Sequence, residues 1–168
     1  NITNIEGVVI GSVVPRIDST LEKMFIDYFN IKPIFVGQGI KSGINIKIDN
    51  PSELGADLVT DCVGALAKYQ APLIIADLGT ANKILVVDKN GSFVGCTISV
   101  GVKIGAKSLT NNTAQLMDVS LVPPNKVIGK NSPDSLNSGA TYGTCCMIEG
   151  MASKIEAELG YPCTRILT

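Results

Sequence analysis

The stretch PLIIADLGTANKILVVDKNGSFVGCTI, residues 72–98, decides the fold of this chain. It holds three apolar runs separated by two polar turns, the first at Gly79-Thr80 and the second at Asp88–Gly91. Apolar runs of this length bounded by Gly, Asp and Asn are typical of strands joined by tight turns. The stretch therefore predicts three consecutive strands, connected first by a turn and then by a hairpin.

The first turn carries polar groups that could do chemistry. Asp77 ends the first apolar run, and Gly79-Thr80 follows it directly. A carboxylate, a hydroxyl and free backbone N–H groups at one sheet edge can hold phosphate oxygens together with a cation. An Asx-type turn that merely closes the strand explains the same residues. A second glycine turn, Ser99-Val-Gly101, follows the third run and favours the phosphate-binding interpretation.

The bulk composition limits the class of protein. The chain has 168 residues, is 45% hydrophobic and carries a net charge of −1, without a block of like charges. This suits one domain of average size or parts of two smaller ones. The charge balance argues against nucleic acid or an anionic membrane surface as the main partner. No apolar run reaches the roughly 18 residues of a membrane-spanning helix.

The five cysteines predict free thiols. Their number is odd, no Cys-x-x-Cys pair occurs, and the chain has no histidine, so the usual zinc sites are not expected. We interpret the thiols as reduced and mostly in the core, including the Cys145-Cys146 pair, in a cytoplasmic protein. Without histidine, a general base must be a carboxylate, Lys, Tyr or Cys.

The pattern outside residues 72–98 predicts strands that alternate with helices, the arrangement of a parallel sheet. The boundary between two units is expected at Gln70-Ala71-Pro72. We expect strands at 7–14, 33–36, 44–48 and 163–167, and helices from the capping box Ser19-x-x-Glu22 to Asn30, from Asn50-Pro51 onward, over 102–113 and over 136–159.

Two further stretches offer candidate site residues. Asp57 ends the segment Asp49–Asp57, whose acids could simply favour a helix N-terminus or could supply a general base to an alcohol. Gly55 would leave room for a ligand beside the backbone. The segment Gly129–Ser132 is either an ordinary loop before a helix or a source of N–H groups and a hydroxyl for a polar substrate.

Together and in order, these motifs resemble those of the type III pantothenate kinases, of the acetate and sugar kinase/Hsp70/actin superfamily. The matching segments span nearly the whole chain; they are Ile10–Pro15, Ser42–Asn45, Asp49–Pro51, Gly55–Asp57, Asp77–Ala81, Ser99, Gly101-Val102, Val127–Asn131 and Ser138–Gly143. The resemblance implies an α/β fold of actin-like ATPase (ribonuclease H-like) domains, with mixed sheets and helices on their faces. Residues 1–71 would be the C-terminal part of the first half, and residues 72–168 the start and most of the second.

The resemblance also implies ATP-dependent phosphorylation of pantothenate to 4′-phosphopantothenate, the first step of coenzyme A synthesis. It implies a homodimer with the active site at the subunit interface, a potassium or ammonium ion, and magnesium with ATP. Carried onto this chain, Asp57 is the proton acceptor and Asp77 binds the monovalent cation. The residues implied to line pantothenate are Gly55, Ala56, Asp57, Leu58 and Ser132, and those implied to contact ATP are Gly79 and Thr80.

Several positions depart from the family pattern. Leu58 stands where an arginine is usual, and Asn82-Lys83 stand where threonines are usual; Lys83 either supplies positive charge or faces solvent. Further departures are Ile48, Val100 and Met117. They leave open a catalytically weakened paralogue that serves as a nucleotide-binding or regulatory accessory protein. A third hypothesis is a kinase of the same superfamily that acts on another small alcohol.

The resemblance also leads us to expect a partial chain. The family begins with an Asp-x-Gly-Asn-Thr phosphate loop that does not occur here, and its Thr-Gly-Gly turn would follow near Thr168. The chain would then cover the central two-thirds of the enzyme and lack half of the ATP cradle.

Overall fold

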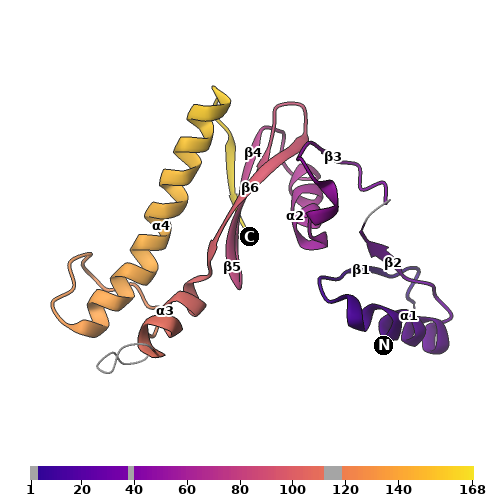
Figure 1. Ribbon diagram of the computed structural model, residues 1–168, viewed down its shortest axis with the longest axis horizontal. Coiled ribbons are helices and arrows are strands. Elements are labelled where there is room, and N and C mark those ends of the chain that lie inside the picture. The colour runs from indigo at the N-terminus through magenta and orange to yellow at the C-terminus, as the bar shows by residue number, and fades with distance from the viewer. Residues whose placement is uncertain (1–3, 38–39, 112–118) are drawn as a thin grey trace.

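A small parallel sheet forms the N-terminal part of the molecule in the computed structural model, which describes residues 4–37, 40–111 and 119–168. Strand β1 (Val9–Gly11) pairs with β2 (Ile34–Val36), and α1 (Pro15–Phe29) connects them. This unit lies beside the larger body of the chain in Figure 1. Its strand–helix–strand order confirms the predicted alternation.

The larger body is built on a five-stranded sheet with the order β3-β6-β5-β4-β7. Its strands are β3 (Asn45–Ile46), β4 (Leu73–Leu78), β5 (Ala81–Val87), β6 (Ser92–Val100) and β7 (Thr164–Leu167). β5 is antiparallel to both β4 and β6, whereas β3 runs parallel to β6 and β7 parallel to β4. The three-strand meander predicted from residues 72–98 is confirmed, as is the mixed α/β class.

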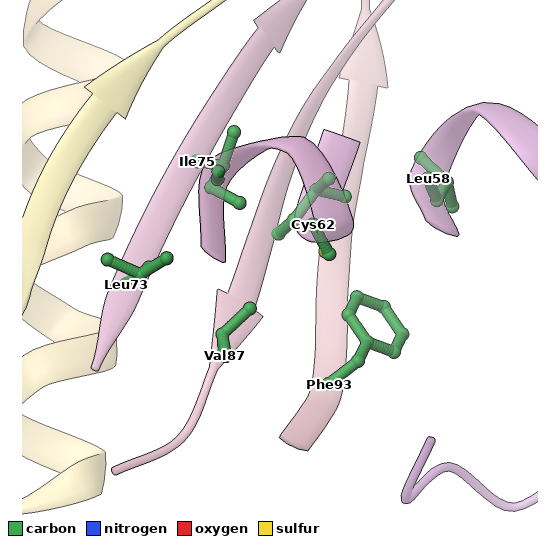
Figure 2. Packing of buried hydrophobic residues seen from close by; sticks show 8 residues of the cluster. Leu58, Cys62, Leu73, Ile75, Val87 and Phe93 are labelled. Atoms are coloured by element: carbon green, nitrogen blue, oxygen red, sulfur yellow. The ribbon is translucent and has the colours of Figure 1, made fainter. Parts of the chain in front are cut away.

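Both faces of this sheet are covered by helices, because side chains alternate between the faces along each strand. On one face, α2 (Ala56–Leu66) packs against Ile75, Val87 and Phe93 (Figure 2). On the other face, α4 (Ser132–Leu159) packs Ala152 against Ile74 and Ile84. The two layers bury most of β4 and β5, and this makes the middle of the sheet a rigid platform for side chains at its ends.

The boundary at residue 71 stays a prediction. Both β3 and α2 precede it in the chain, yet β3 pairs with β6 and α2 packs on the sheet formed by later strands.

Three helices begin at other residues than the sequence pattern indicated. α1 starts at Pro15, before the capping box at Ser19, because proline suits the first helical turn. The segment after Asn50 is a short 3₁₀ turn, η1 (Pro51–Glu53), and α2 begins only after the extended Gly55. α4 starts at Ser132, four residues before the predicted start, since the Asn131 side chain caps it by accepting from the Asp134 N–H at 2.8 Å.

The predicted helix over 102–113 is observed as α3 (Val102–Asn111), which contacts α4. Residues 112 and 113, and Met117 among the family departures, lie outside the described residues.

The expectation that most thiols lie in the core was wrong. Cys62 is buried in the cluster under α2, but Cys96, Cys145 and Cys146 are exposed and Cys163 is half-buried. All five are free thiols. The vicinal pair lies on α4, whose small and polar residues leave most of its surface facing solvent. None of the helices in the described part of the chain combines the length and apolar character required to cross a bilayer.

Candidate functional site

Strand register brings an acid and a base together next to the Gly79-Thr80 turn. Asp77 of β4 and Lys83 of β5 are direct cross-strand partners, which places their side chains on the same face of the sheet. Ile75 and Leu85, two positions further from the turn, belong to the cluster covered by α2. Asp77 and Lys83 therefore lie on the α2 face, where the Lys83 Nζ is 2.5 Å from the Asp77 Oδ2.

The first turn of α2 supplies a second carboxylate. Gly55 is the N-cap of α2, and Asp57 lies in its first turn. A Cβ at position 55 would lie 2.5 Å from the Asp57 Oδ1, so glycine lets this carboxylate fold back over the helix start. The other carboxylate oxygen, Oδ2, accepts a hydrogen bond from the Lys83 Nζ at 2.7 Å. Asp57 and Asp77, twenty residues apart in the sequence, thus meet at one ammonium group.

The exposed fraction of the Lys83, Asp77 and Asp57 side chains increases with distance from the sheet. Lys83 is 16% exposed and Asp77 is 20% exposed, whereas Asp57 is 44% exposed. The ammonium is thus held between a largely enclosed carboxylate and one that solvent, or a ligand, can reach. Asp57 is the group of the three best placed to touch a substrate.

The charges of this cluster shift the pKa values of its members. Burial alone would raise the pKa of Asp57, but the hydrogen bond and the charge of Lys83 outweigh it and hold the pKa below 3.8. Burial opposes protonation of Lys83, yet its hydrogen bonds to Asp57 and then Asp77 raise its pKa above 10.5. Both groups are therefore ionised at neutral pH.

Asp61 lies one turn beyond Asp57 on α2 and experiences the opposite shift. Burial and then the negative charge of Asp77 raise its pKa, and Lys83 offsets them only in part. Asp61 is thus an electrostatic neighbour of the cluster. The Lys83 ammonium donates its hydrogen bonds to Asp57 and Asp77.

The turn beyond Asp77 is tightly fixed to the end of β6. The Gly101 N–H donates to the Thr80 carbonyl at 3.1 Å, and the Asn82 side-chain amide donates to the Val100 carbonyl at 3.1 Å. A Cβ at position 101 would overlap the carbonyl oxygens of Gly79 and Thr80, so only glycine permits this approach. Gly79 and Thr80 are exposed at the turn, where the Gly79 N–H donates to the Ala81 carbonyl at 3.2 Å and the Thr80 side chain can reach a ligand.

The stretch from Gly55 to Leu58 divides between surface and core. Leu58 is 8% exposed and belongs to the hydrophobic cluster with Cys62 and Phe93 (Figure 2). Its side chain is therefore used in packing, which limits any contact between residue 58 and a substrate to the backbone. Ala56 is also buried, at 7% exposure, and it lines a cavity of about 340 Å³. This cavity is walled mainly by apolar groups, among them Val36, Ile40, Ile46, Leu54 and Val59.

Ser132 lies elsewhere in the molecule. It is exposed in the first turn of α4, next to the segment Gly129–Asn131. That segment lies so close to α4 that a Cβ at Gly129 would overlap the backbone of Ser135. In Figure 1 this end of α4 lies beside α3, on the far side of the sheet from α2. The structure brings Asp57 and Asp77 together but does not bring Ser132 to them within one chain.

A separate monovalent cation does not fit at Asp77 as the residues stand, because the Asp77 Oδ2 already contacts the Lys83 ammonium. Within the described ranges, no group of three or more acidic or sulfur-bearing side chains is arranged to hold a metal ion. The arrangement offers an ionised, partly exposed carboxylate that can accept a proton, beside a fixed positive charge that can face an anion.

The role of Lys83 in this site could not be decided from the sequence. Lys83 could either supply a positive charge or face solvent. Its position opposite Asp77 depends on a three-residue loop, Gly79–Ala81, between the paired residues Leu78 and Asn82. Counting outward from the Leu78–Asn82 pair places Asp77 opposite Lys83, whereas a turn of only Gly79 and Thr80 would have placed Asp77 opposite Asn82. The length of the loop therefore decides this register.

The sequence and the fold were compared with those of known proteins. A sequence model of the family "Type III pantothenate kinase" matches residues 1–154. Curated relatives with that name are 38% identical in Exiguobacterium sibiricum and 39% identical in Geobacillus sp. (strain WCH70), each over 160 residues. The matches cover 95% of this chain but only 63% and 62% of the relatives, so the chain spans less than two-thirds of their length.

A solved structure supports the fold independently. It is that of a conserved Baf family protein from Campylobacter jejuni, described as a candidate transcriptional activator. The TM-score is 0.60 at 16% sequence identity, over 88% of this chain and 64% of that one. The mixed sheet with helices on both faces is consistent with the actin-like ATPase fold of the matched family. By the extent of the family match and the identity to these relatives, the chain belongs to the type III pantothenate kinase family.

Proposed function

We propose that the protein phosphorylates pantothenate with ATP, giving 4′-phosphopantothenate in the first step of coenzyme A synthesis. The observation that carries the proposal is the meeting of Asp57 and Asp77 at the Lys83 ammonium, beside the exposed Gly79-Thr80 turn. Family membership supports the choice of pantothenate as the alcohol. The cytoplasm, where ATP is available, is the proposed location.

Asp57 is the proposed proton acceptor. The transferred phosphoryl group is attacked by the pantothenate hydroxyl, whose proton moves to the Asp57 carboxylate while ADP leaves. Because the pKa of Asp57 is low, this carboxylate is ionised and ready but only weakly basic. That suits phosphoryl transfer, in which positioning and charge stabilisation contribute more than strong basicity.

The substrate is proposed to bind along Gly55 to Asp57 and the backbone of Leu58. The cavity of about 340 Å³ that opens at Ala56 is consistent with this, because its apolar wall suits the dimethyl and methylene groups of pantothenate. The first turn of α2 would then present its polar groups to the hydroxyl end of the substrate.

ATP, bound as its magnesium complex, is the proposed phosphate donor. Gly79 and Thr80 are proposed to contact it, because both are exposed at a turn that Gly101 holds fixed against the end of β6. A fixed turn costs little to order when the nucleotide binds.

A homodimer with the active site at the interface is also proposed. Asp57 and Ser132 are both carried over from the family as substrate-binding residues. Yet α2, which carries Asp57, and the start of α4, which carries Ser132, lie in separate regions of one chain (Figure 1). A partner subunit that brings its Ser132 to the Asp57 of the first would complete the site.

The experiment is a product assay on the full-length protein with ATP and magnesium. Pantothenate is offered alongside glycerol, a hexose and other small alcohols, and phosphorylated products are identified by mass spectrometry. We expect 4′-phosphopantothenate as the main product. A folded protein that binds ATP but leaves pantothenate unchanged would contradict the proposal, as would faster phosphorylation of another alcohol.

A further inference from the structure

Lys83 occupies the position at which a free cation would neutralise Asp77. Its Nζ lies 2.5 Å from the Asp77 Oδ2 and 2.7 Å from the Asp57 Oδ2, so both contacts are within charge-assisted hydrogen-bond distance. The side chain is 16% exposed, which means that the ammonium is held inside the cluster and does not lie on the surface. The cross-strand pairing with Asp77 and the α2 face above it fix where the ammonium can lie.

The position of the Lys83 ammonium, rather than the net charge of the cluster, disfavours a second cation at Asp77. The negative charges of Asp77 and Asp57 raise the pKa of Asp61, and Lys83 is the positive group that acts on Asp57 and Asp61. A second positive ion in contact with Asp77 would lie next to the ammonium, where like charges repel. A lysine ammonium also carries the same unit charge as a potassium or ammonium ion, with its own donors.

We propose that Lys83 is a built-in cation that takes the place of a free monovalent ion at Asp77, so that phosphoryl transfer by this protein does not depend on added potassium or ammonium. The inference rests on the proposed function, because it concerns the phosphate end of the same site. Lys83 is a positioning residue in this account. It holds Asp57 and Asp77 in place and supplies the positive charge that faces the phosphates.

The first test measures pantothenate phosphorylation by the full-length protein, prepared without potassium or ammonium and kept at constant ionic strength with tetramethylammonium chloride. Potassium should change the wild-type rate by less than about twofold. Lys83→Thr should be about 10²-fold slower without potassium, the typical loss on removing one group that stabilises transition-state charge. Added potassium should restore much of that loss, because the variant opens Asp77 to a free ion.

Two further variants sharpen this comparison. Lys83→Arg keeps the charge and should remain insensitive to potassium. Lys47→Thr removes a lysine that pairs with Asp88 at 3.1 Å outside the site, and it should behave like the wild type. A strong potassium requirement in the wild type would overturn the inference, and so would a Lys83→Thr variant that stays active without potassium.

A binding measurement separates this inference from the proposed function. Thallium(I), which mimics potassium, is titrated into the wild type and Lys83→Thr with a non-hydrolysable ATP analogue, and thallium NMR reports bound ion. Saturable binding to Lys83→Thr but not to the wild type supports the inference, even if pantothenate proves not to be the substrate. Saturable binding to the wild type refutes it, and this outcome does not depend on the folding of the variant.

Discussion

Replacing Lys83 with methionine removes the ammonium but keeps an unbranched apolar side chain. The resulting loss of stability therefore reports on the charge. Removing one partner of a buried ion pair costs about 3–5 kcal/mol of stability, whereas an exposed ion pair contributes about 0.2–1 kcal/mol. The Lys83–Asp77 ion pair resembles a buried pair, because its side chains are 16% and 20% exposed. The Lys83–Asp57 ion pair is closer to an exposed pair. We therefore expect Lys83→Met to lower the free energy of unfolding by about 2–4 kcal/mol.

Urea unfolding of the full-length protein, followed by circular dichroism at neutral pH, measures this loss. Lys47→Met is the matched control, because Lys47 pairs with Asp88 but is 45% exposed, and it should cost about 1 kcal/mol or less. A double-mutant cycle with Asp77→Asn should give a coupling energy of about 1 kcal/mol or more. The reasoning is refuted if Lys83→Met is no more destabilising than Lys47→Met, or if the coupling energy is near zero.

Three more predictions concern the surroundings of the site. Gly101→Ala should destabilise the protein by about 1–3 kcal/mol in thermal unfolding, because the added methyl group overlaps backbone carbonyls. Gly150→Ala, on the open surface of α4, should instead stabilise the protein by about 0.5–1 kcal/mol. Equal effects of the two substitutions would contradict the packing described. The pKa of Asp61 is raised, so its contribution to stability is present below pH 3.8 and is lost as the pH rises through its folded-state pKa. Asp61→Asn should therefore be more stable than the wild type near neutral pH, with a difference in urea midpoint that shrinks on acidification; a less stable variant at neutral pH would be inconsistent with this. Burial raises the pKa of Cys62 to about 12, so iodoacetamide at mildly alkaline pH should label exposed Cys145 and leave Cys62 unmodified in the native protein, as peptide mass mapping would show. Comparable labelling of both thiols would mean that α2 does not hold the Cys62 side chain against the sheet.

The meander could be predicted from the sequence because its signals are local. Each strand in residues 72–98 is a short apolar run, and each turn carries the Gly, Asp or Asn that a tight reversal needs. Asp88 illustrates this, since its carboxylate accepts from the N–H groups of Asn90 and Ser92 within the hairpin. Such contacts form between neighbours in the sequence, so they leave a pattern in it.

Helix starts were harder to predict because competing caps lie within a few residues of one another. The capping box at Ser19 was preferred to Pro15, although the proline opens α1. The Asn50-Pro51 pair does start a helical turn, but Gly55 interrupts it and α2 begins anew. This interruption matters for the site, because it puts Asp57 in a first turn, folded back beside Gly55.

The thiols and Lys83 depend on tertiary contacts that residue type does not reveal. Cysteine is buried more often than not, yet α4 presents Cys145 and Cys146 to solvent because its packing uses residues further along the helix, such as Ala152. Asp57 and Asp77 were candidates from their local residue patterns as well as from the family motifs, but the two segments are separate in the sequence. Only the packing of α2 on the sheet shows that both carboxylates share the Lys83 ammonium.

The most direct test of the proposed chemistry compares Asp57→Asn with Asp61→Asn in the full-length protein. Both changes remove one carboxylate from the same helix, one turn apart, and both variants are first checked for native circular dichroism. Formation of 4′-phosphopantothenate from ATP and pantothenate should fall about 10²–10⁴-fold in Asp57→Asn, the usual contribution of a general base. Asp61→Asn should retain most of the wild-type rate. An Asp57→Asn variant that turns over as fast as Asp61→Asn would contradict the assignment of Asp57 as the proton acceptor.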